Sequence, residues 1–204
     1  MVPDETLLVR DTAELDALYG EALERSVKKQ MAQLDDLCRQ FIAVSPMVML
    51  GTAGDVSPRG DVPGFVKVAD DKTLLVPDRR GNNRIDSLRN IVNNGQVGLL
   101  FLVPGVDETL RVNGHADISK DPSLTNQFEY RGTTPKTVLV IQVTEVYIHC
   151  SRALVRSDLW NPAKHAPKGT VPSFGTMLEA HTKGFVEAKA VDEDLITRVP
   201  TTLY

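Results

Sequence analysis

The chain has 204 residues, of which 42% are hydrophobic and 25% are charged, and its formal net charge is -4 at pH 7. These proportions are those of a globular domain and exclude a disordered chain, while the small negative charge argues against nucleic acid or an anionic membrane as a partner. No apolar run approaches the ~18 residues that a membrane-spanning helix needs.

The N-terminal segment is acidic and lacks the basic and apolar regions of a signal peptide, which favours a cytoplasmic protein. In that reducing compartment we expect the two cysteines, Cys38 and Cys150, to be free thiols. The four histidines do not show the HxxxH or HExxH spacing of a zinc site, so we expect no metal.

Helical periodicity dominates the first part of the chain. Asp11 or Thr12 can cap a helix that runs through Tyr19, a second helical pattern covers residues 22–28, and a third covers 34–41. The apolar faces of these helices need a partner, which is either the later sheet or a second subunit.

From residue 47 onward the pattern changes to short β-rich runs. Six strands are predicted, at 47–53, 65–69, 73–76, 97–103, 109–118 and 137–150. Asp70-Asp71-Lys72 predicts a hairpin turn, and Asn113-Gly114 indicates a bulge.

Three further helices are expected in this part of the chain, at 84–92, 151–160 and 173–181. Asn93-Asn94-Gly95 would stop the first of them. The segment after Lys189 is expected to be a surface extension.

Consecutive strands joined by tight turns, with one short helix among them, favour an antiparallel sheet over a doubly wound parallel one. Six strands in roughly 100 residues close most economically as a small barrel. We therefore expect a mainly β fold, with N-terminal helices packed outside the barrel. Its parts would be a helical extension at 1–44, the barrel domain at 45–162 and a C-terminal extension with a short helix at 163–204.

The segment from Ser57 to Gly95 is the most informative stretch in the chain, and it contains RRGNNR at residues 79–84. Arg79, Arg80 and Arg84 flank Gly81, which lets the backbone approach a ligand. Arginine forks and the free amides of a helix start both bind phosphate, and Asn83 can cap the following helix or donate its amide. Arg84 in the first helical turn opposes the helix dipole unless an anion offsets its charge. Solvated arginines on a connecting loop fit the same spacing, so both interpretations remain open.

Arg59 precedes a backbone-rich stretch, residues 60–64, whose amides can contact a flat heterocycle. The alternative is a connecting loop in which Arg59 pairs with Asp61. Further along, Arg111 lies on a predicted strand.

Arg152 and Arg156 stand at i,i+4 spacing, and Trp160, the only tryptophan, follows after four more residues. One helix face would then carry two cations and an indole, which suits an anionic, planar ligand. An amphipathic helix that is anchored by Trp160 and paired with acidic surface residues explains the same spacing.

Four motifs occur in a characteristic order: PRGDVPGFVKV at 58–68, LLVPDRRGNNRIDSLRNI at 74–91, LRVNGHA at 110–116 and HCSRALVRSDLW at 149–160. Together they resemble the FMN-binding split-barrel family related to pyridoxamine 5'-phosphate oxidase, and in particular a bacterial branch of predicted FMN-dependent enzymes with a PDRxGNNR pattern. The resemblance covers about Met47 to Pro162, more than half of the chain.

This resemblance implies a six-stranded split barrel and a homodimer with two FMN sites between the subunits. Asn83 and Arg84 would hold the phosphate, with Arg79 or Arg80 nearby. The residues expected to border the flavin ring or the ribityl chain are Arg59, Pro63, Phe65 and Val66.

Further contacts to FMN are implied from elsewhere in the chain. Arg111 would approach from the neighbouring strand, while Arg152, Arg156 and Trp160 would come from the partner subunit.

The implied function is that of an FMN-dependent oxidoreductase, in which hydride passes through flavin N5 to or from an unidentified small molecule. Beyond the tryptophan, the vitamin oxidases carry a substrate motif with arginine and histidine, whereas this chain has NPAKHAPKG with Lys164 and His165. His165, Lys168 and His181 either reach the substrate face or are ordinary surface residues, and no catalytic residue is assigned. Two alternatives remain: a flavin-binding or redox-sensing protein without turnover, and a split barrel that binds haem or a deazaflavin.

Overall fold

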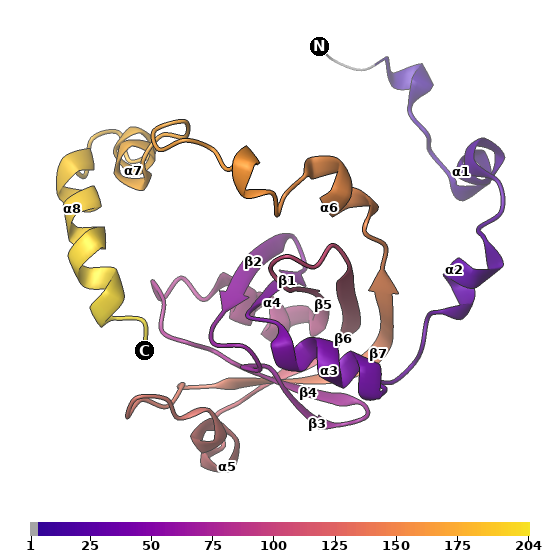
Figure 1. Ribbon diagram of the computed structural model, residues 1–204, viewed down its shortest axis with the longest axis horizontal. Helices are drawn as coiled ribbons and strands as arrows, with labels where there is room; N and C mark the ends of the chain where they lie inside the picture. Colours follow the sequence, from indigo (N-terminus) through magenta and orange to yellow (C-terminus); the bar gives the residue numbers. More distant parts are fainter. Residues whose placement is uncertain (1–3) are drawn as a thin grey trace.

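The computed structural model of the chain describes residues 4–204 and is built on one antiparallel sheet (Figure 1). Its strands lie in the order β2-β1-β5-β6-β7-β4-β3. They are β1 (Met47–Thr52), β2 (Asp55–Gly60), β3 (Lys67–Asp70), β4 (Thr73–Pro77), β5 (Gln96–Leu102), β6 (Thr109–Ser119) and β7 (Val138–His149).

The prediction of a six-stranded closed barrel is wrong in two respects. The sheet has a seventh strand, β2, which pairs with β1 through a turn at Ala53-Gly54. It is also open, because the edge strands β2 and β3 do not pair with each other among the described residues. Pro58 and Gly60 hid β2 in the sequence, since both residues weaken a strand pattern. An edge strand tolerates proline because its missing N–H removes no bond from the interior of the sheet.

The six predicted strands are present, with boundaries that differ by at most two residues. The hairpin at Asp70-Asp71-Lys72 is confirmed, since Asp70 of β3 pairs with Thr73 of β4. The bulge is also confirmed, because the β6–β7 register shifts between Asn113 and Gly114. A Cβ atom at Gly114 would lie 2.3 Å from the Gln142 carbonyl oxygen, so the close approach of β6 and β7 at the bulge requires glycine.

Eight helices accompany the sheet in the described part of the chain: α1 (Thr12–Tyr19), α2 (Glu24–Lys28), α3 (Asp36–Val44), α4 (Asp86–Asn94), α5 (Pro122–Thr125), α6 (Arg152–Ser157), α7 (Phe174–His181) and α8 (Ala188–Arg198). Short 3-10 turns lie at Glu5–Leu7, Asn126–Phe128, Pro162–Lys164 and Val199–Thr201. None of the helices in residues 4–204 is long and apolar enough to cross a membrane.

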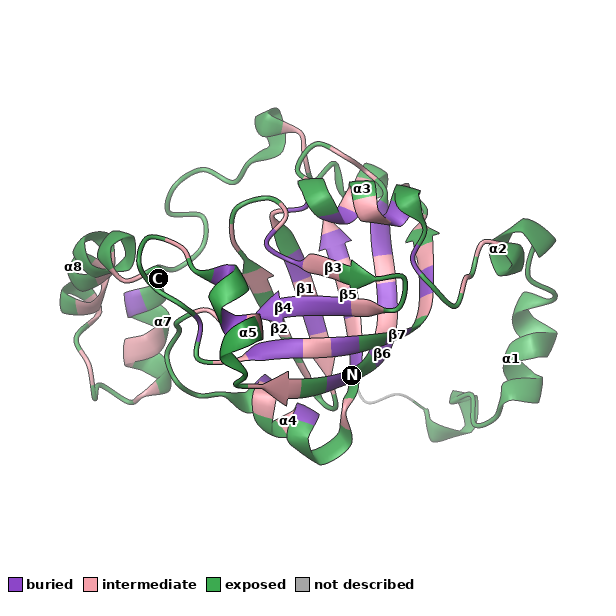
Figure 2. Ribbon diagram, turned by 90° about the horizontal axis from the view of Figure 1, so that it is seen from below, coloured by how far each residue is buried: buried purple, intermediate pink, exposed green. Residues whose placement is uncertain are grey.

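Helix α3 packs against the sheet, where it contacts β3 and β6 and contributes side chains to the main hydrophobic core (Figure 2). Its Cys38 and Ile42 are buried together with Leu34 and with strand residues such as Phe101. Burial raises the pKa of the Cys38 thiol to about 11, so Cys38 serves as a packing residue. Cys150 is exposed, and both cysteines are free, as predicted.

Helix α4 contacts β6, β1 and the edge strand β2. Its Ile91 enters the core, and Gly95 ends it in the left-handed conformation with φ 74°, as predicted. The start of α4 therefore lies beside β2, the strand that the sequence did not reveal.

Helices at both ends of the chain lie away from the sheet. Helices α1 and α2 bury none of their residues, and Figure 1 shows them on an arm that leads away from the strands. The segment after Lys189, expected to be a surface extension, forms most of α8, which buries no residue and packs against α7.

Candidate functional site

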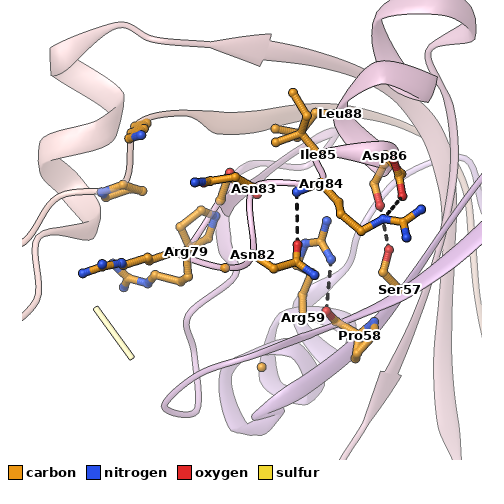
Figure 3. A pocket seen from close by; sticks show the side chains of 18 of the residues that line it. Ser57, Pro58, Arg59, Arg79, Asn82, Asn83, Arg84, Ile85, Asp86 and Leu88 are labelled. Atoms are coloured by element: carbon orange, nitrogen blue, oxygen red, sulfur yellow. Dashed lines mark hydrogen bonds and ion pairs between the residues drawn. The ribbon is translucent and has the colours of Figure 1, made fainter. Parts of the chain in front are cut away.

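A pocket of about 930 Å³ opens between β2, the loop from Pro77 to Ile85 and the first turn of α4 (Figure 3). Residues 133–136 and Tyr204 form part of its wall. Basic side chains outnumber carboxylates, so the pocket favours an anionic ligand. The basic residues are Arg59, Arg79, Arg80, Arg84 and Lys136, and the acidic ones are Asp55, Asp78 and Asp86.

The pocket gathers half of the site residues expected from the sequence: Arg59, Phe65, Arg79, Arg80, Asn83 and Arg84. Pro63 is exposed and Val66 belongs to the core, and neither lines the pocket. Arg111, Arg152, Arg156 and Trp160 also lie outside it.

The loop before α4 holds an unusual backbone conformation. Asn83 has φ 61° and Ile85 has φ 53°, so left-handed residues stand on both sides of Arg84. For a β-branched residue such as Ile85 this conformation is a genuine outlier, and each such residue costs about 1–3 kcal/mol. Strain of this kind persists where the surrounding structure enforces it, and it is concentrated at ligand-binding sites.

Helix α4 begins at Asp86, two residues later than predicted, because Ile85 occupies the N-cap. Of the two roles considered for Asn83, the helix cap is not formed. Ile85 is the N-cap residue and its side chain gives no cap, while the neighbouring Asn82 Oδ1 accepts a hydrogen bond from the Arg84 amide at 3.1 Å. The first-turn amides of α4 thus have no side-chain cap, while Asp86, Ser87 and Leu88 line the pocket.

Arg84 lies before the helix and not in its first turn as predicted. Its Nε donates to Asp86 Oδ2 at 2.8 Å, with the two side chains 76% and 48% exposed. An ion pair this exposed contributes at most about 1 kcal/mol, so Arg84 can exchange Asp86 for a ligand anion at little cost. Figure 3 shows Arg84 and Arg79 on different sides of the loop.

Arg79 is held much more firmly than Arg84. Its Nε donates to Asp61 Oδ2 at 2.6 Å and its Nη1 to the Phe128 carbonyl at 2.7 Å, and the Asp61 side chain is only 1% exposed. The alternative in which Arg59 pairs with Asp61 is therefore wrong, and Arg59 donates to the Pro58 carbonyl instead. Arg80 is exposed and has no ion-pair partner among residues 4–204, which makes it the freer of the two adjacent arginines.

Two carboxyl groups near the pocket respond differently to burial. Burial by itself would raise the pKa of Asp61, but hydrogen bonds from Tyr204, the Val62 amide and Arg79 hold that pKa below its ordinary value. Burial raises the pKa of Asp78, and the nearby Arg59 charge offsets this only in part. Asp78 has no ion-pair partner in the described part of the chain and faces the pocket.

A hydroxyl cluster joins β2 to the start of α4. Asp55 Oδ2 accepts hydrogen bonds from Ser57 Oγ at 3.1 Å and from Ser87 Oγ at 3.0 Å, and the two hydroxyl oxygens lie 2.6 Å apart. Ser87 is buried, so these bonds fix the first turn of α4 against the edge strand.

Two of the predicted residues outside the pocket, Arg111 and Trp160, have partners of their own. Arg111 Nη1 donates to the Tyr147 hydroxyl at 2.8 Å, and Trp160 Nε1 donates to the Val106 carbonyl at 2.9 Å. The prediction of one helical face through Trp160 is wrong. Helix α6 ends at Ser157, and Asp158 turns left-handed with φ 53°.

The sequence did not single out several residues of the pocket. Ser57 lay in an unrecognised strand, and Lys136 lay in a polar connection without periodicity. Tyr204 reaches the pocket from a segment that was expected to be a surface extension. Among the described residues, no group of three or more His, Cys, Asp or Glu side chains is arranged to hold a metal ion.

A family model described as pyridoxamine 5'-phosphate oxidase matches residues 34–150, more than half of the chain. No curated protein sequence matches the chain.

Among solved structures, HupZ from Group A Streptococcus is 22% identical with a TM-score of 0.46, over 56% of this chain and 93% of that one. General Stress Protein 26 from Bacillus anthracis is 21% identical with a TM-score of 0.41, over 54% and 88%. An FMN-binding protein from Syntrophomonas wolfei is 10% identical with a TM-score of 0.42, over 68% and 95%. These likenesses are too distant to assign a function.

Replacing the buried carboxylate tests how firmly Arg79 is held. Asp61→Asn is expected to lower the free energy of unfolding by roughly 3 kcal/mol at neutral pH, because loss of one partner of a buried ion pair costs about 3–5 kcal/mol. The folded-state pKa of Asp61 lies below its ordinary value of 3.8. Its contribution is therefore complete above that value and is lost as the pH falls through the lowered pKa.

Urea denaturation across the pH range measures this. Parent and Asp61→Asn should differ at neutral pH and converge in acid as the pH falls through the lowered pKa of Asp61. The control is Asp194→Asn, which breaks the exposed pair with Arg198 and is expected to cost less than about 0.5 kcal/mol. A difference between parent and Asp61→Asn that stays constant into acid would contradict the assignment.

Proposed function

Because this chain belongs to the pyridoxamine 5'-phosphate oxidase family, we propose that it is an oxidoreductase that binds FMN in the pocket at the start of α4. One observation carries the proposal: the strained loop Asn83–Ile85 presents Arg84 and an uncapped helix start to a basic pocket. A phosphate group would offset both the positive charge of Arg84 and the positive end of the helix dipole.

The residues of the pocket fit the phosphate of FMN. Arg84 gives up only a weak exposed pair when it turns to an anion, and Arg80 has no competing partner in residues 4–204. Arg79 would contribute its charge from the fixed position beside Asp61. Of the two neighbours, Arg80 is therefore the one we assign to direct contact with the phosphate, together with Arg84 and Asn83.

The remaining lining residues fit the rest of the cofactor. Phe65 offers an apolar surface to the flavin ring, and Arg59 and Asp78 offer a donor and an acceptor for its polar edge or for the ribityl hydroxyls. When bound, FMN would supply hydride acceptance and donation at N5, while this chain supplies binding, orientation and electrostatics. The proposed substrate is a small molecule, and no side chain is assigned as an acid or base.

A second subunit would complete the site. Arg152, Arg156 and Trp160 lie outside the pocket of their own chain, as residues that serve the partner's pocket would. We therefore propose a homodimer with FMN at the interface. Sedimentation velocity on the FMN-loaded protein should give the mass of two chains, and a sedimenting monomer with bound FMN would contradict this part of the proposal.

Removing the arginine proposed to bind the phosphate should weaken FMN binding. Arg84→Ala is expected to raise the Kd for FMN by tenfold or more, because a hydrogen bond to a charged group contributes about 1.5–3 kcal/mol. Quenching of flavin fluorescence measures the Kd. The matched control is Arg89→Ala, an exposed arginine on α4 that does not line the pocket, and it should bind like the parent. Equal affinity of Arg84→Ala and parent would make Arg84 a solvated loop residue.

Anaerobic reduction tests the enzymatic part of the proposal. With FMN bound, NADH, NADPH or an amine substrate such as pyridoxamine phosphate is expected to bleach the flavin absorbance, and admission of oxygen should restore it. Persistent yellow colour with all three reductants would favour a flavin-binding or redox-sensing protein without turnover. A protein that stays colourless in added FMN would favour another cofactor, such as haem or a deazaflavin.

A further inference from the structure

Helices α7 and α8 form a hairpin whose main contacts are internal. Gly175 of α7 lies so close to α8 that a side chain there would meet the Ala188 carbonyl oxygen at 2.2 Å, and its amide donates to Asp192 Oδ1 at 2.8 Å. Neither helix has a major contact with a strand, and Figures 1 and 2 both show the hairpin at the side of the sheet. The hairpin is thus a unit of its own that borders the body of the protein.

The chain returns from this hairpin to the pocket through the tail segment, residues 199–204. The Tyr204 hydroxyl donates to Asp61 Oδ1 at 2.6 Å. The Tyr204 ring lies 4.6 Å from the ring of Tyr130, centroid to centroid, and the Arg79 guanidinium lies 5.3 Å from the Tyr204 ring. Tyr204 lines the pocket, so the tail segment forms part of the pocket wall.

These contacts link the tail segment to a residue of the proposed FMN site. Tyr204 binds one oxygen of the Asp61 carboxylate, and Arg79 binds the other at 2.6 Å. The Asp61 side chain is only 1% exposed, and a buried carboxylate requires such partners. Without the hydroxyl, Asp61 would lose one of its donors, and the carboxylate that fixes Arg79 would be less firmly placed.

We infer that Tyr204 is a positioning residue of the pocket, which acts through Asp61 to fix Arg79 and seats the tail segment as a wall over the ligand. The part of this inference that concerns FMN rests on the proposed function. Seating and ligand binding then reinforce each other: a bound anion is attracted to the charge of Arg79, which Asp61 and the seated tail keep in position, and by linkage the seated tail raises the affinity for that anion.

The fold does not depend on this contact. Helix α8 and the turn after it contain no buried residue, and Tyr204 is only half-buried. A Tyr204 variant should therefore fold like the parent. Tyr204→Phe removes the hydroxyl but keeps the ring contacts with Tyr130 and Arg79, while Tyr204→Ala removes both. The matched control is Tyr19→Phe, because Tyr19 is 83% exposed on α1.

Hydrogen exchange by mass spectrometry of residues 195–204, combined with FMN titration, tests the inference. Without ligand, exchange in this segment should rise about tenfold in Tyr204→Phe and more in Tyr204→Ala, since a hydrogen bond to a charged group is lost. FMN should slow this exchange in the parent, and Tyr204→Phe should bind FMN about threefold or more weakly. Tyr19→Phe should match the parent in both measurements.

Three results would contradict the inference or separate it from the proposed function. Equal exchange in Tyr204→Phe and parent would show that the hydroxyl does not seat the tail. Faster exchange with unchanged FMN affinity would make Tyr204 a surface attachment that does not act on the pocket. If the parent does not bind FMN, the proposed function and the coupling to FMN both fail, while the exchange rates without ligand still decide whether Tyr204 seats the tail segment.

Discussion

The backbone around Arg84 is the constraint on which the pocket depends. Left-handed Asn83 and Ile85 on either side of it cost about 1–3 kcal/mol each, so the loop needs support from its surroundings. The hydroxyl cluster of Asp55, Ser57 and Ser87 gives this support, because it fixes the first turn of α4 to the edge strand β2. The result is a helix start without a side-chain cap, held beside a cation that has only a weak partner. A phosphate group satisfies both features.

A second support lies on the other side of the pocket, around the buried Asp61. This carboxylate fixes Arg79 and accepts a hydrogen bond from the Tyr204 hydroxyl. It therefore joins three parts of the chain: the residue that follows β2, the loop before α4 and the tail segment. The two supports differ in kind. The hydroxyl cluster belongs to the sheet and its neighbouring helix, whereas Tyr204 comes from a hairpin outside the core. Residues near Arg84 are therefore fixed by the sheet and its helix, and Arg79 is fixed in part by Asp61, which Tyr204 contacts from outside the core.

Local patterns in the sequence predicted much of this architecture, while long-range contacts were beyond their reach. Six strands, the turn at 70–72 and the bulge at Asn113-Gly114 follow from alternation and turn chemistry, which act over a few residues. The strand β2 was missed because Pro58 and Gly60 obscure its pattern, although an edge position tolerates both. Because β2 was missed, the sequence could not predict that Asp61 pairs with Arg79. It also could not predict that Tyr204, more than 140 residues later in the chain, contacts Asp61. For the loop RRGNNR, the sequence left phosphate binding and a plain connecting loop both open, and the phosphate role stays a prediction. The strain of its backbone appears only in the dihedral angles.

The affinities of the protein for FMN and riboflavin, measured side by side by fluorescence quenching, test the central claim most directly. The two flavins share the ring and the ribityl chain and differ by the phosphate. If the loop around Arg84 and the start of α4 bind that phosphate, FMN should bind at least tenfold more tightly than riboflavin, as expected for one charge-assisted contact or more. Equal affinities, or a preference for riboflavin, would contradict the account.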